Sequence, residues 1–254
     1  MTWLALWVLG VGVMDLCRPT RPGWLVPVVG AVVLYGGALL AGLTAAADLV
    51  VLSASIIPLV LWWTASERAQ GRRGRAHLLA LGALLAGPLL LLGLSGWAST
   101  PGGPLARWLA WAELPFTGDG PVGGRALEHL LLVAALVVAN VATANIVVRL
   151  VLVSVGALRP RNSGLAQPAD RLRGGRLLGP MERMLILGLG LAGQLTAAGL
   201  VIGAKGLIRF PELQAKAKDG STIDAVGIDE ITEYFLIGSF VSWLVALGSL
   251  ALTR

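Results

Sequence analysis

Residues 181–204 read MERMLILGLGLAGQLTAAGLVIGA, and this stretch decides the fold class of the chain. It is almost entirely apolar, and charged residues bracket it at both ends: Glu182 and Arg183 at one, Lys205 and Arg209 at the other. A helix that crosses a bilayer core about 30 Å thick needs about 20 apolar residues. The stretch therefore predicts a transmembrane helix.

The composition of the whole chain supports the same conclusion. Of its 254 residues, 56% are hydrophobic and 13% are charged. A water-soluble fold of this size would lack the polar surface to cover its core, so we expect an integral membrane protein. The abundance of Ala, Leu, Gly and Arg is typical of a bacterium with a GC-rich genome, which predicts the bacterial plasma membrane as the location.

Hydropathy along the chain predicts an all-α, polytopic transmembrane bundle of about seven spans. The first span is short and could instead lie in the interface or re-enter, which would leave six, and the third could extend through residues 45–47. The predicted spans are Trp3–Leu16, Trp24–Leu43, Leu49–Trp63, His77–Trp97, His129–Val153, Met181–Ala204 and Tyr234–Leu252.

Basic residues predict the orientation, because cytoplasmic loops are enriched in Lys and Arg. They collect in alternate connectors, so we expect the N-terminus outside and the C-terminus in the cytoplasm. The same confinement to short loops argues against a nucleic-acid partner. The arginines concerned are Arg18, Arg21, Arg68, Arg72, Arg73, Arg75, Arg159, Arg161, Arg171, Arg173, Arg176 and Arg254.

Several aromatic and acidic residues fall at predicted span ends. Amphipathic indole rings favour the headgroup level, which we expect for Trp3, Trp24, Trp62, Trp63 and Trp97. Asp15 and Asp48 are isolated in the sequence, and we expect them to be solvated.

A short amphipathic helix is predicted between the fourth and fifth spans. It follows the helix-breaking sequence Pro-Gly-Gly-Pro at residues 101–104. Apolar residues then recur at helical spacing: Leu105, Trp108, Leu109 and Ala112. We expect this helix to lie on the outer leaflet.

Polar residues inside spans are costly and therefore candidate functional residues. The candidates are Asn140, Asn145 and Arg149 in the fifth span and Gln194 in the sixth. They could form a polar track into the bundle, but ordinary interhelical hydrogen bonding is the interpretation we favour. Gly199 and Gly203 are spaced for close approach of another helix.

A second group of candidates is charged: Glu182 and Arg183 at the start of the stretch 181–204, and Lys205, Arg209, Glu230 and Glu233 at the outer ends of the last two spans. If these spans form an antiparallel hairpin, Lys205 and Arg209 face Glu230 and Glu233, which predicts a cross-hairpin ion pair. The alternative is that the two cations hold a lipid phosphate or another anion.

No metal or cofactor is predicted. The outer-loop acids match no calcium-loop spacing, and His77 and His129 lack partners at zinc-ligand spacing. Cys17 is the single cysteine of the chain.

The last third of the chain carries a distinctive set of residues: Gly175, Arg176, Gly179, Glu182–Leu185, Gln194, Ala198, Gly199, Ala204, Lys205, Arg209, Phe210, Glu212, Glu233–Ser239 and Ser242. In these residues the segment Gly175–Leu252 resembles the C-terminal part of a family of uncharacterised bacterial integral membrane proteins, a domain of unknown function. The resemblance implies a shared two-helix module, and it supplies no reaction because the family has no established activity. Residues 1–174 carry no such resemblance.

We therefore expect one integrated membrane domain, in which residues 1–174 hold the N-terminal helices and residues 175–254 the two-helix module. Three functions compete. A non-enzymatic component or partner of a membrane complex is favoured by the small-residue surfaces. A transporter or lipid-handling protein that binds an anionic group near the outer leaflet is the alternative. An enzyme is the least favoured, because no acid and base occur at useful spacing. Lipids and other membrane subunits are the expected partners.

Overall fold

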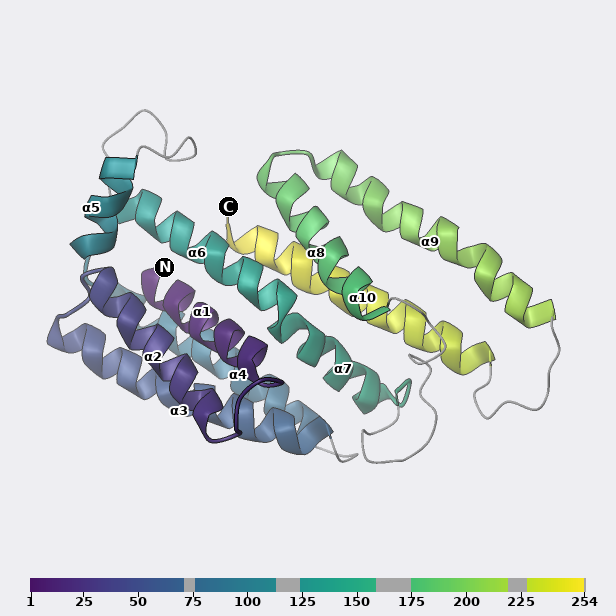
Figure 1. Cartoon of the computed structure of the whole chain (residues 1–254), viewed down its shortest axis with the longest axis horizontal. Coiled ribbons are helices and arrows are strands. Elements are labelled where there is room, and N and C mark those ends of the chain that lie inside the picture. Colours follow the sequence, from purple (N-terminus) through teal and green to yellow (C-terminus); the bar gives the residue numbers. More distant parts are fainter. Residues whose placement is uncertain (71–75, 113–123, 159–174, 219–227, 254) are drawn as a thin grey trace. The chain divides into compact units, whose positions relative to one another are not determined.

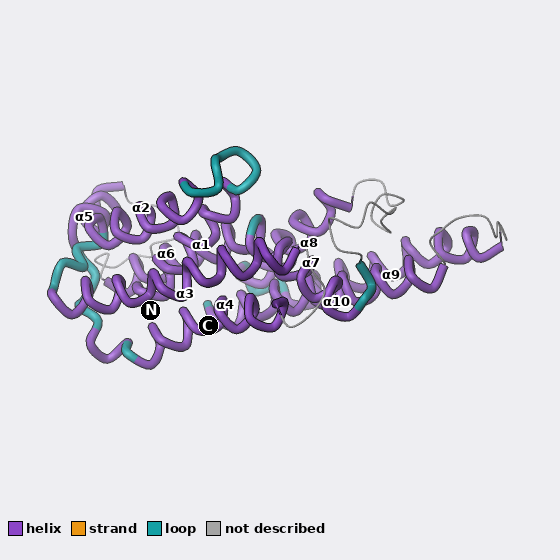
Figure 2. The backbone as a smooth tube through the Cα atoms, turned by 90° about the horizontal axis from the view of Figure 1, so that it is seen from below, coloured by secondary structure: helices purple, strands orange, loops and turns teal. Residues whose placement is uncertain are grey.

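The computed structural model describes residues 1–70, 76–112, 124–158, 175–218 and 228–253, with the backbone alone for residues 70, 175–177, 206, 208–218 and 228–231. All regular elements within these ranges are helices, and none of the residues described forms a strand (Figure 2). This confirms the all-helical prediction.

The helices follow one another along the chain (Figure 1). Their bounds are α1 Thr2–Cys17, α2 Leu25–Leu40, α3 Ala46–Gln70, α4 Ala76–Gly93, the 3₁₀ helix η1 Ser95–Trp97, α5 Gly103–Ala112, α6 Gly124–Val141, α7 Thr143–Val155, α8 Gly175–Leu191, α9 Leu195–Lys218 and α10 Ile228–Leu252.

By length and composition, four of the described helices can cross a membrane. They are residues 46–69, 76–93, 124–141 and 232–252, and four further apolar helices or helix segments are shorter: Thr2–Cys17, Leu25–Leu40, Thr143–Val155 and Leu195–Lys205. The four long apolar helices support the prediction of a membrane protein. The third predicted span does extend toward residue 45, since α3 begins at Ala46.

The chain divides into two compact units. Unit 1 comprises residues 1–65 and 78–143, and unit 2 comprises residues 66–77 and 144–254.

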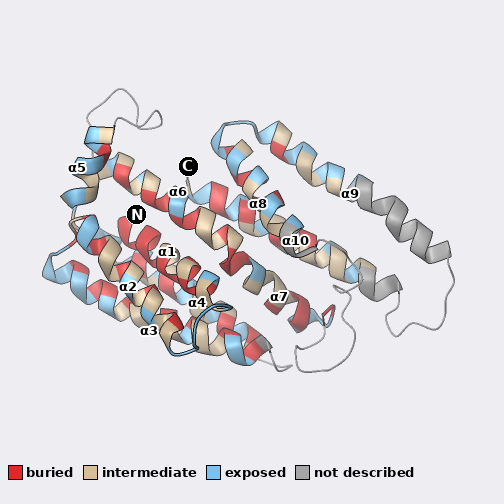
Figure 3. Ribbon diagram, viewed as in Figure 1, coloured by how far each residue is buried: buried red, intermediate tan, exposed pale blue. Residues whose placement is uncertain are grey.

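Helix α1 is the centre of unit 1. Eleven of its 16 residues are buried, which is not the pattern of a helix lying in the membrane interface (Figure 3). Glycines let its neighbours approach closely: a Cβ atom on Gly10 would lie 2.9 Å from the Gly30 carbonyl oxygen of α2, and one on Gly12 would lie 3.2 Å from the Ala139 nitrogen of α6. The core of this unit is therefore built by backbone contact around α1.

Two Trp–Asp hydrogen bonds join α1 to α3, one in each direction. Trp3 of α1 donates its indole N–H to Asp48 Oδ1 at 2.9 Å, and Trp62 of α3 donates to Asp15 Oδ2 at 3.1 Å. Asp15 also pairs with Arg18 at 2.7 Å. All four Trp and Asp side chains are buried. The prediction that both acids are solvated is wrong, because each has an indole donor from the other helix that replaces water.

Unit 2 contains a hairpin where a single span was predicted. The stretch 181–204 is split between α8 and α9 by a turn at Gly193, whose φ of 75° is left-handed and suits glycine. The backbone N–H of Gln194 closes the turn by donating to the backbone carbonyl of Leu189 at 2.8 Å. Helices α8 and α9 then pack against each other and against α10, with a core of Ile186, Ala198 and Ala246.

The predicted fifth span is also divided. Helix α6 ends at Val141 and α7 begins at Thr143, next to the border between the units. The buried side chain of Asn140 donates to the Leu136 carbonyl one turn earlier, at 2.8 Å. Such side-chain bonding to the backbone competes with the helical ladder, which fits a helix end at this point.

Candidate functional site

Two adjacent residues of α8 hold a polar cluster within unit 2. Glu182 and Arg183 are both buried, with 7% and 2% of their surface exposed. Successive residues on a helix point about 100° apart, so the two side chains reach different neighbours. Glu182 contacts α9, whereas Arg183 contacts α7 and α10.

The Arg183 guanidinium bridges three helices. Its Nη1 donates to the Ser242 hydroxyl of α10 at 2.8 Å, and its Nη2 donates to the Asn145 side-chain oxygen of α7. The planar guanidinium offers five donors in a fixed fork, which suits acceptors that approach from two directions. Arg183 therefore fixes α7 and α10 relative to α8.

Lys205 completes the cluster from α9. Its Nζ lies 2.6 Å from Glu182 Oε2, and the side chains of Lys205 and Glu182 are 14% and 9% exposed. The same ammonium group lies 5.5 Å from the ring centroid of Phe235 on α10. An ion pair and a cation–π contact thus join α9 to both neighbouring helices.

The hairpin gives Lys205 a carboxylate partner that the sequence did not predict. Lys205 pairs with Glu182 because the turn at Gly193 brings α9 back along α8, 23 residues away in the sequence. Glu233 of α10 is exposed. The side chains of Arg209 and Glu230 lie outside the described residues.

The structure brings together only part of the predicted polar track. Asn145 lies in the cluster through Arg183, and Arg149 lies one turn further along α7, half-buried. Gln194 is exposed in the α8–α9 turn instead of lying at a span centre. Asn140 belongs to unit 1, where its amide bonds to its own helix.

Sequence reasoning missed Ser242 as a partner of Arg183, and it also missed the roles of Asp15 and Asp48 in unit 1. The rule that acids in apolar segments need partners could have identified both aspartates. Which tryptophan serves as partner depends on how α1 and α3 are arranged, and no local pattern shows this.

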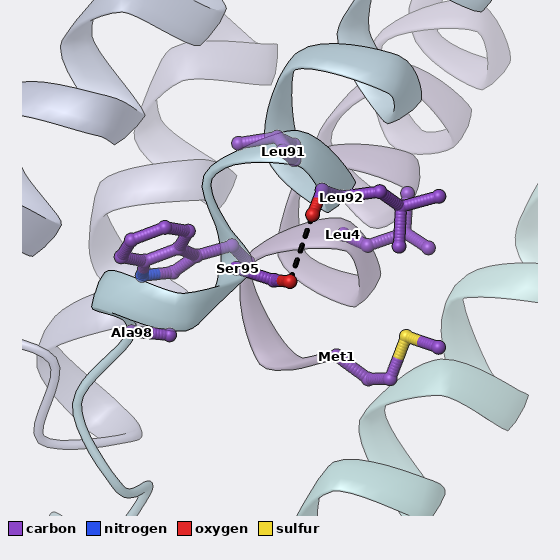
Figure 4. A pocket seen from close by; sticks show the side chains of 7 residues that line it. Met1, Leu4, Leu91, Leu92, Ser95 and Ala98 are labelled. Atoms are coloured by element: carbon purple, nitrogen blue, oxygen red, sulfur yellow. Dashed lines mark hydrogen bonds between the residues drawn. The ribbon is translucent and has the colours of Figure 1, made fainter.

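A small pocket lies elsewhere, in unit 1, and is largely apolar (Figure 4). Its one hydroxyl, on Ser95, already donates to the Leu92 carbonyl at 2.8 Å. It contains none of the candidate residues. The residues that line it are Met1, Trp3, Leu4, Leu91, Leu92, Ser95 and Ala98.

The cluster in unit 2 has the chemistry of a structural joint. Each cation has a hydrogen-bonding partner on another helix, and no nucleophile lies beside a base in the contacts given above. Among the described residues, no group of three His, Cys, Asp or Glu side chains could hold a metal ion. In comparisons with known proteins, no family model, no curated protein and no solved structure matched the chain.

Proposed function

We propose that this chain is a non-enzymatic component of a membrane protein complex, and that it binds a transmembrane helix of its partner through α9. The observation that carries the proposal is an open small-residue face on α9. A Cβ atom added to Gly199 or Gly203 would meet no atom within 4 Å, and the neighbouring Leu200 and Leu207 are 69% and 77% exposed.

This face differs from the packed side of the same helix. Ala198, Ile202 and Lys205 face α8 and α10, where Ala198 is 2% exposed and Lys205 is paired. Gly199 and Gly203, four residues apart, lie on another side. In a membrane, two glycines at this spacing allow a second helix backbone to approach closely, and the gain in van der Waals contact holds the pair together.

The partner that fits this face is an apolar helix that also carries small residues at a spacing of four. Lipid chains fill a glycine notch poorly, whereas such a helix would contact the backbone along a full turn. Such a helix could belong to a second copy of the chain or to a different subunit. The mass of the isolated complex distinguishes these two partners.

The experiment is purification in mild detergent after chemical cross-linking, followed by native mass spectrometry. We expect Gly199→Leu and Gly203→Leu to lower the fraction in complex about tenfold, as a loss of about 1.4 kcal/mol would. Gly248→Leu is the matched control, because Gly248 of α10 is also exposed with nothing within 4 Å. Equal complex formation by all three variants would remove α9 as the binding face.

The alternative function, an anion or lipid-phosphate site at Lys205, has less support. Its ammonium group is already neutralised by Glu182 at 2.6 Å and is 14% exposed, so a phosphate would have to displace a carboxylate. The resemblance of residues 175–252 to a family of uncharacterised bacterial membrane proteins stays a prediction, as does the bacterial plasma membrane as the location.

For the threading, we propose that the arginine-bearing connectors 68–75 and 159–176 face the cytoplasm. If residues 181–204 form the α8–α9 hairpin and not a single span, every later segment lies on the opposite side of the membrane from the one predicted. Both ends of a hairpin lie on one side of the membrane whatever its depth, so residues 205–218 return to the cytoplasmic side. Lys205, Arg209, Lys216 and Lys218 support this, because the positive-inside rule counts Lys and Arg. Helix α10 would then carry the C-terminus outside, opposite to the side predicted from single crossings.

A further inference from the structure

The short helix α5 presents an unusual outward face. Pro104, Arg107, Trp108 and Trp111 follow the i, i+3, i+4, i+7 spacing of one helix side, and all four are exposed. Trp108 is 50% exposed and Trp111 is 81% exposed. The opposite side carries Leu109, which is fully buried in unit 1. Of the predicted apolar stripe, Leu109 is buried and Leu105 and Ala112 are partly buried, whereas Trp108 is exposed. The outward side therefore combines a guanidinium with two indoles.

The start of α5 is held by contacts between backbones. Gly42, after α2, and Gly103, at the start of α5, both have left-handed φ values, 74° and 70°. A Cβ atom on Gly103 would lie 2.6 Å from the Gly42 nitrogen, so neither position tolerates a side chain without a shift. The Gly102 amide also donates to the Ala41 carbonyl at 2.8 Å. We call this contact the Gly42–Gly103 joint.

Two further contacts fix the segment that leads into α5. The Ser99 amide donates to Asp48 Oδ1 at the start of α3, at 3.2 Å. Pro101 contacts Gly124, the first residue of α6, where a Cβ atom would lie 3.1 Å from the Pro101 carbonyl oxygen. Helix α5 thus lies across one end of unit 1, in contact with α2 and α6 (Figures 1 and 2), and the segment before it is bonded to α3.

The place of α5 along the chain gives its level relative to the bilayer. It lies between α4 and α6, both long and apolar enough to cross a membrane, and it begins ten residues after the last residue of α4, Gly93. Two consecutive spans leave the hydrocarbon at their connected ends. A helix fixed at those ends is therefore at the level of the lipid headgroups.

We propose that the outward face of α5 is a lipid-headgroup site, in which Arg107 binds a lipid phosphate and Trp108 and Trp111 insert their rings among the glycerol and upper acyl groups. Guanidinium and phosphate are complementary in charge and geometry. Indole rings favour this layer because one edge is polar and the body is apolar. The Gly42–Gly103 joint makes the depth of this face a fixed property of unit 1. The proposal is independent of the α9 partner.

The test is depth-dependent fluorescence quenching in vesicles of phosphatidylcholine and phosphatidylglycerol. A single nitrobenzoxadiazole label is placed at Ala110→Cys in a Cys17→Ser background, and quenching is compared for nitroxides on the headgroup, carbon 5 and carbon 12 of the lipid. We expect the headgroup and carbon 5 nitroxides to quench at least twice as strongly as the carbon 12 nitroxide. Quenching by none of the three would assign the face to water or to a protein partner and would overturn the proposal.

Matched variants test the parts of the site. Gly103→Ala should reduce the difference in quenching between the three nitroxide positions. Gly102→Ala should preserve that difference, because a Cβ atom on Gly102 meets nothing within 4 Å. Arg107→Gln should lower the enrichment of phosphatidylglycerol around the label about fivefold. The double variant Trp108→Ser, Trp111→Ser should shift the label toward water. If the quenching profile of Gly103→Ala equals that of Gly102→Ala, the Gly42–Gly103 joint does not fix the depth of α5. Circular dichroism verifies that each variant is folded.

Discussion

The Nζ of Lys205 lies 2.6 Å from Oε2 of Glu182, so the two arms of the α8–α9 hairpin are joined by an ion pair far from their connecting turn. Neither partner is well solvated. Removal of one would leave the other charge without compensation in a medium that stabilises it poorly.

We therefore expect Lys205→Ala to destabilise the protein by roughly 3 kcal/mol, the low end of the cost of an uncompensated buried charge. The free energy of unfolding is measurable by SDS titration in mixed micelles, with tryptophan fluorescence as the signal. The exchange Glu182→Lys with Lys205→Glu should recover part of the loss. Glu233→Ala is the control and should change little, and a loss for Glu233→Ala equal to that for Lys205→Ala would contradict the assigned pair.

Arg183→Lys tests whether the guanidinium is needed as a bridge. A lysine keeps the charge but cannot reach Asn145 and Ser242 together in the same fork geometry. We expect a loss of about 2 kcal/mol, the value of a hydrogen bond to a charged group. Asn145→Ala and Ser242→Ala should each lose less, and the Arg183→Lys, Ser242→Ala double variant should lose less than the sum. Strict additivity would show that Arg183 does not act through Ser242.

The reciprocal Trp–Asp bonds of unit 1 predict unequal effects of the same substitution at different tryptophans. Trp3→Phe and Trp62→Phe each remove the indole donor of a buried aspartate and should cost about 1–3 kcal/mol. Trp97→Phe is the matched control, because Trp97 is 68% exposed. Thermal unfolding in detergent, followed by circular dichroism, gives the comparison, and three equal midpoints would exclude a stabilising role for these bonds.

Gly193→Ala tests the turn that divides residues 181–204. Alanine at a φ of 75° should destabilise by about 1 kcal/mol. Gly188→Ala, in the middle of α8 and with nothing within 4 Å, should instead stabilise by up to about 1 kcal/mol. Opposite signs distinguish the hairpin from a continuous helix, in which both substitutions would be favourable.

A reporter fusion at the C-terminus tests the threading that the hairpin implies. Alkaline phosphatase is active only outside the cytoplasm, and green fluorescent protein folds mainly inside it. We expect an active phosphatase fusion and a dark fluorescent one after Arg254. Fusions after Lys218 should show the reverse, and a C-terminus inside the cytoplasm would restore the single-crossing arrangement.

The fold class followed from the sequence because the length of an apolar segment is a property of consecutive residues. The break at Gly193 did not follow, since Gly188 and Gly190 lie in the same apolar run and remain helical. Glycine marks a helix end only when the residues around it have a surface to fold back onto, and here that surface is α8 itself.

The candidate site was predictable in its residues and not in its pairs. Glu182, Arg183 and Lys205 stand out in the sequence as charges at the ends of the apolar stretch 181–204, and Asn145 stands out as a polar residue within a predicted span. The partner of Lys205 depended on whether residues 181–204 form one helix or two. The sequence predicts solvated side chains for Asp15 and Asp48 because the ends of spans and the buried ends of helices look alike in sequence.

The central position of α1 has a consequence for biosynthesis. Helix α1 is the first of these helices to leave the ribosome, yet the surfaces that cover it belong to α2, α3 and α6, and the last of these ends at Val141. Asp15 and Trp3 gain their hydrogen-bonding partners only when α3 is present, and the surface at Gly12 is covered only when α6 is present. During synthesis the polar side chains and close-packing glycines of α1 therefore stay uncovered until α6 has been made.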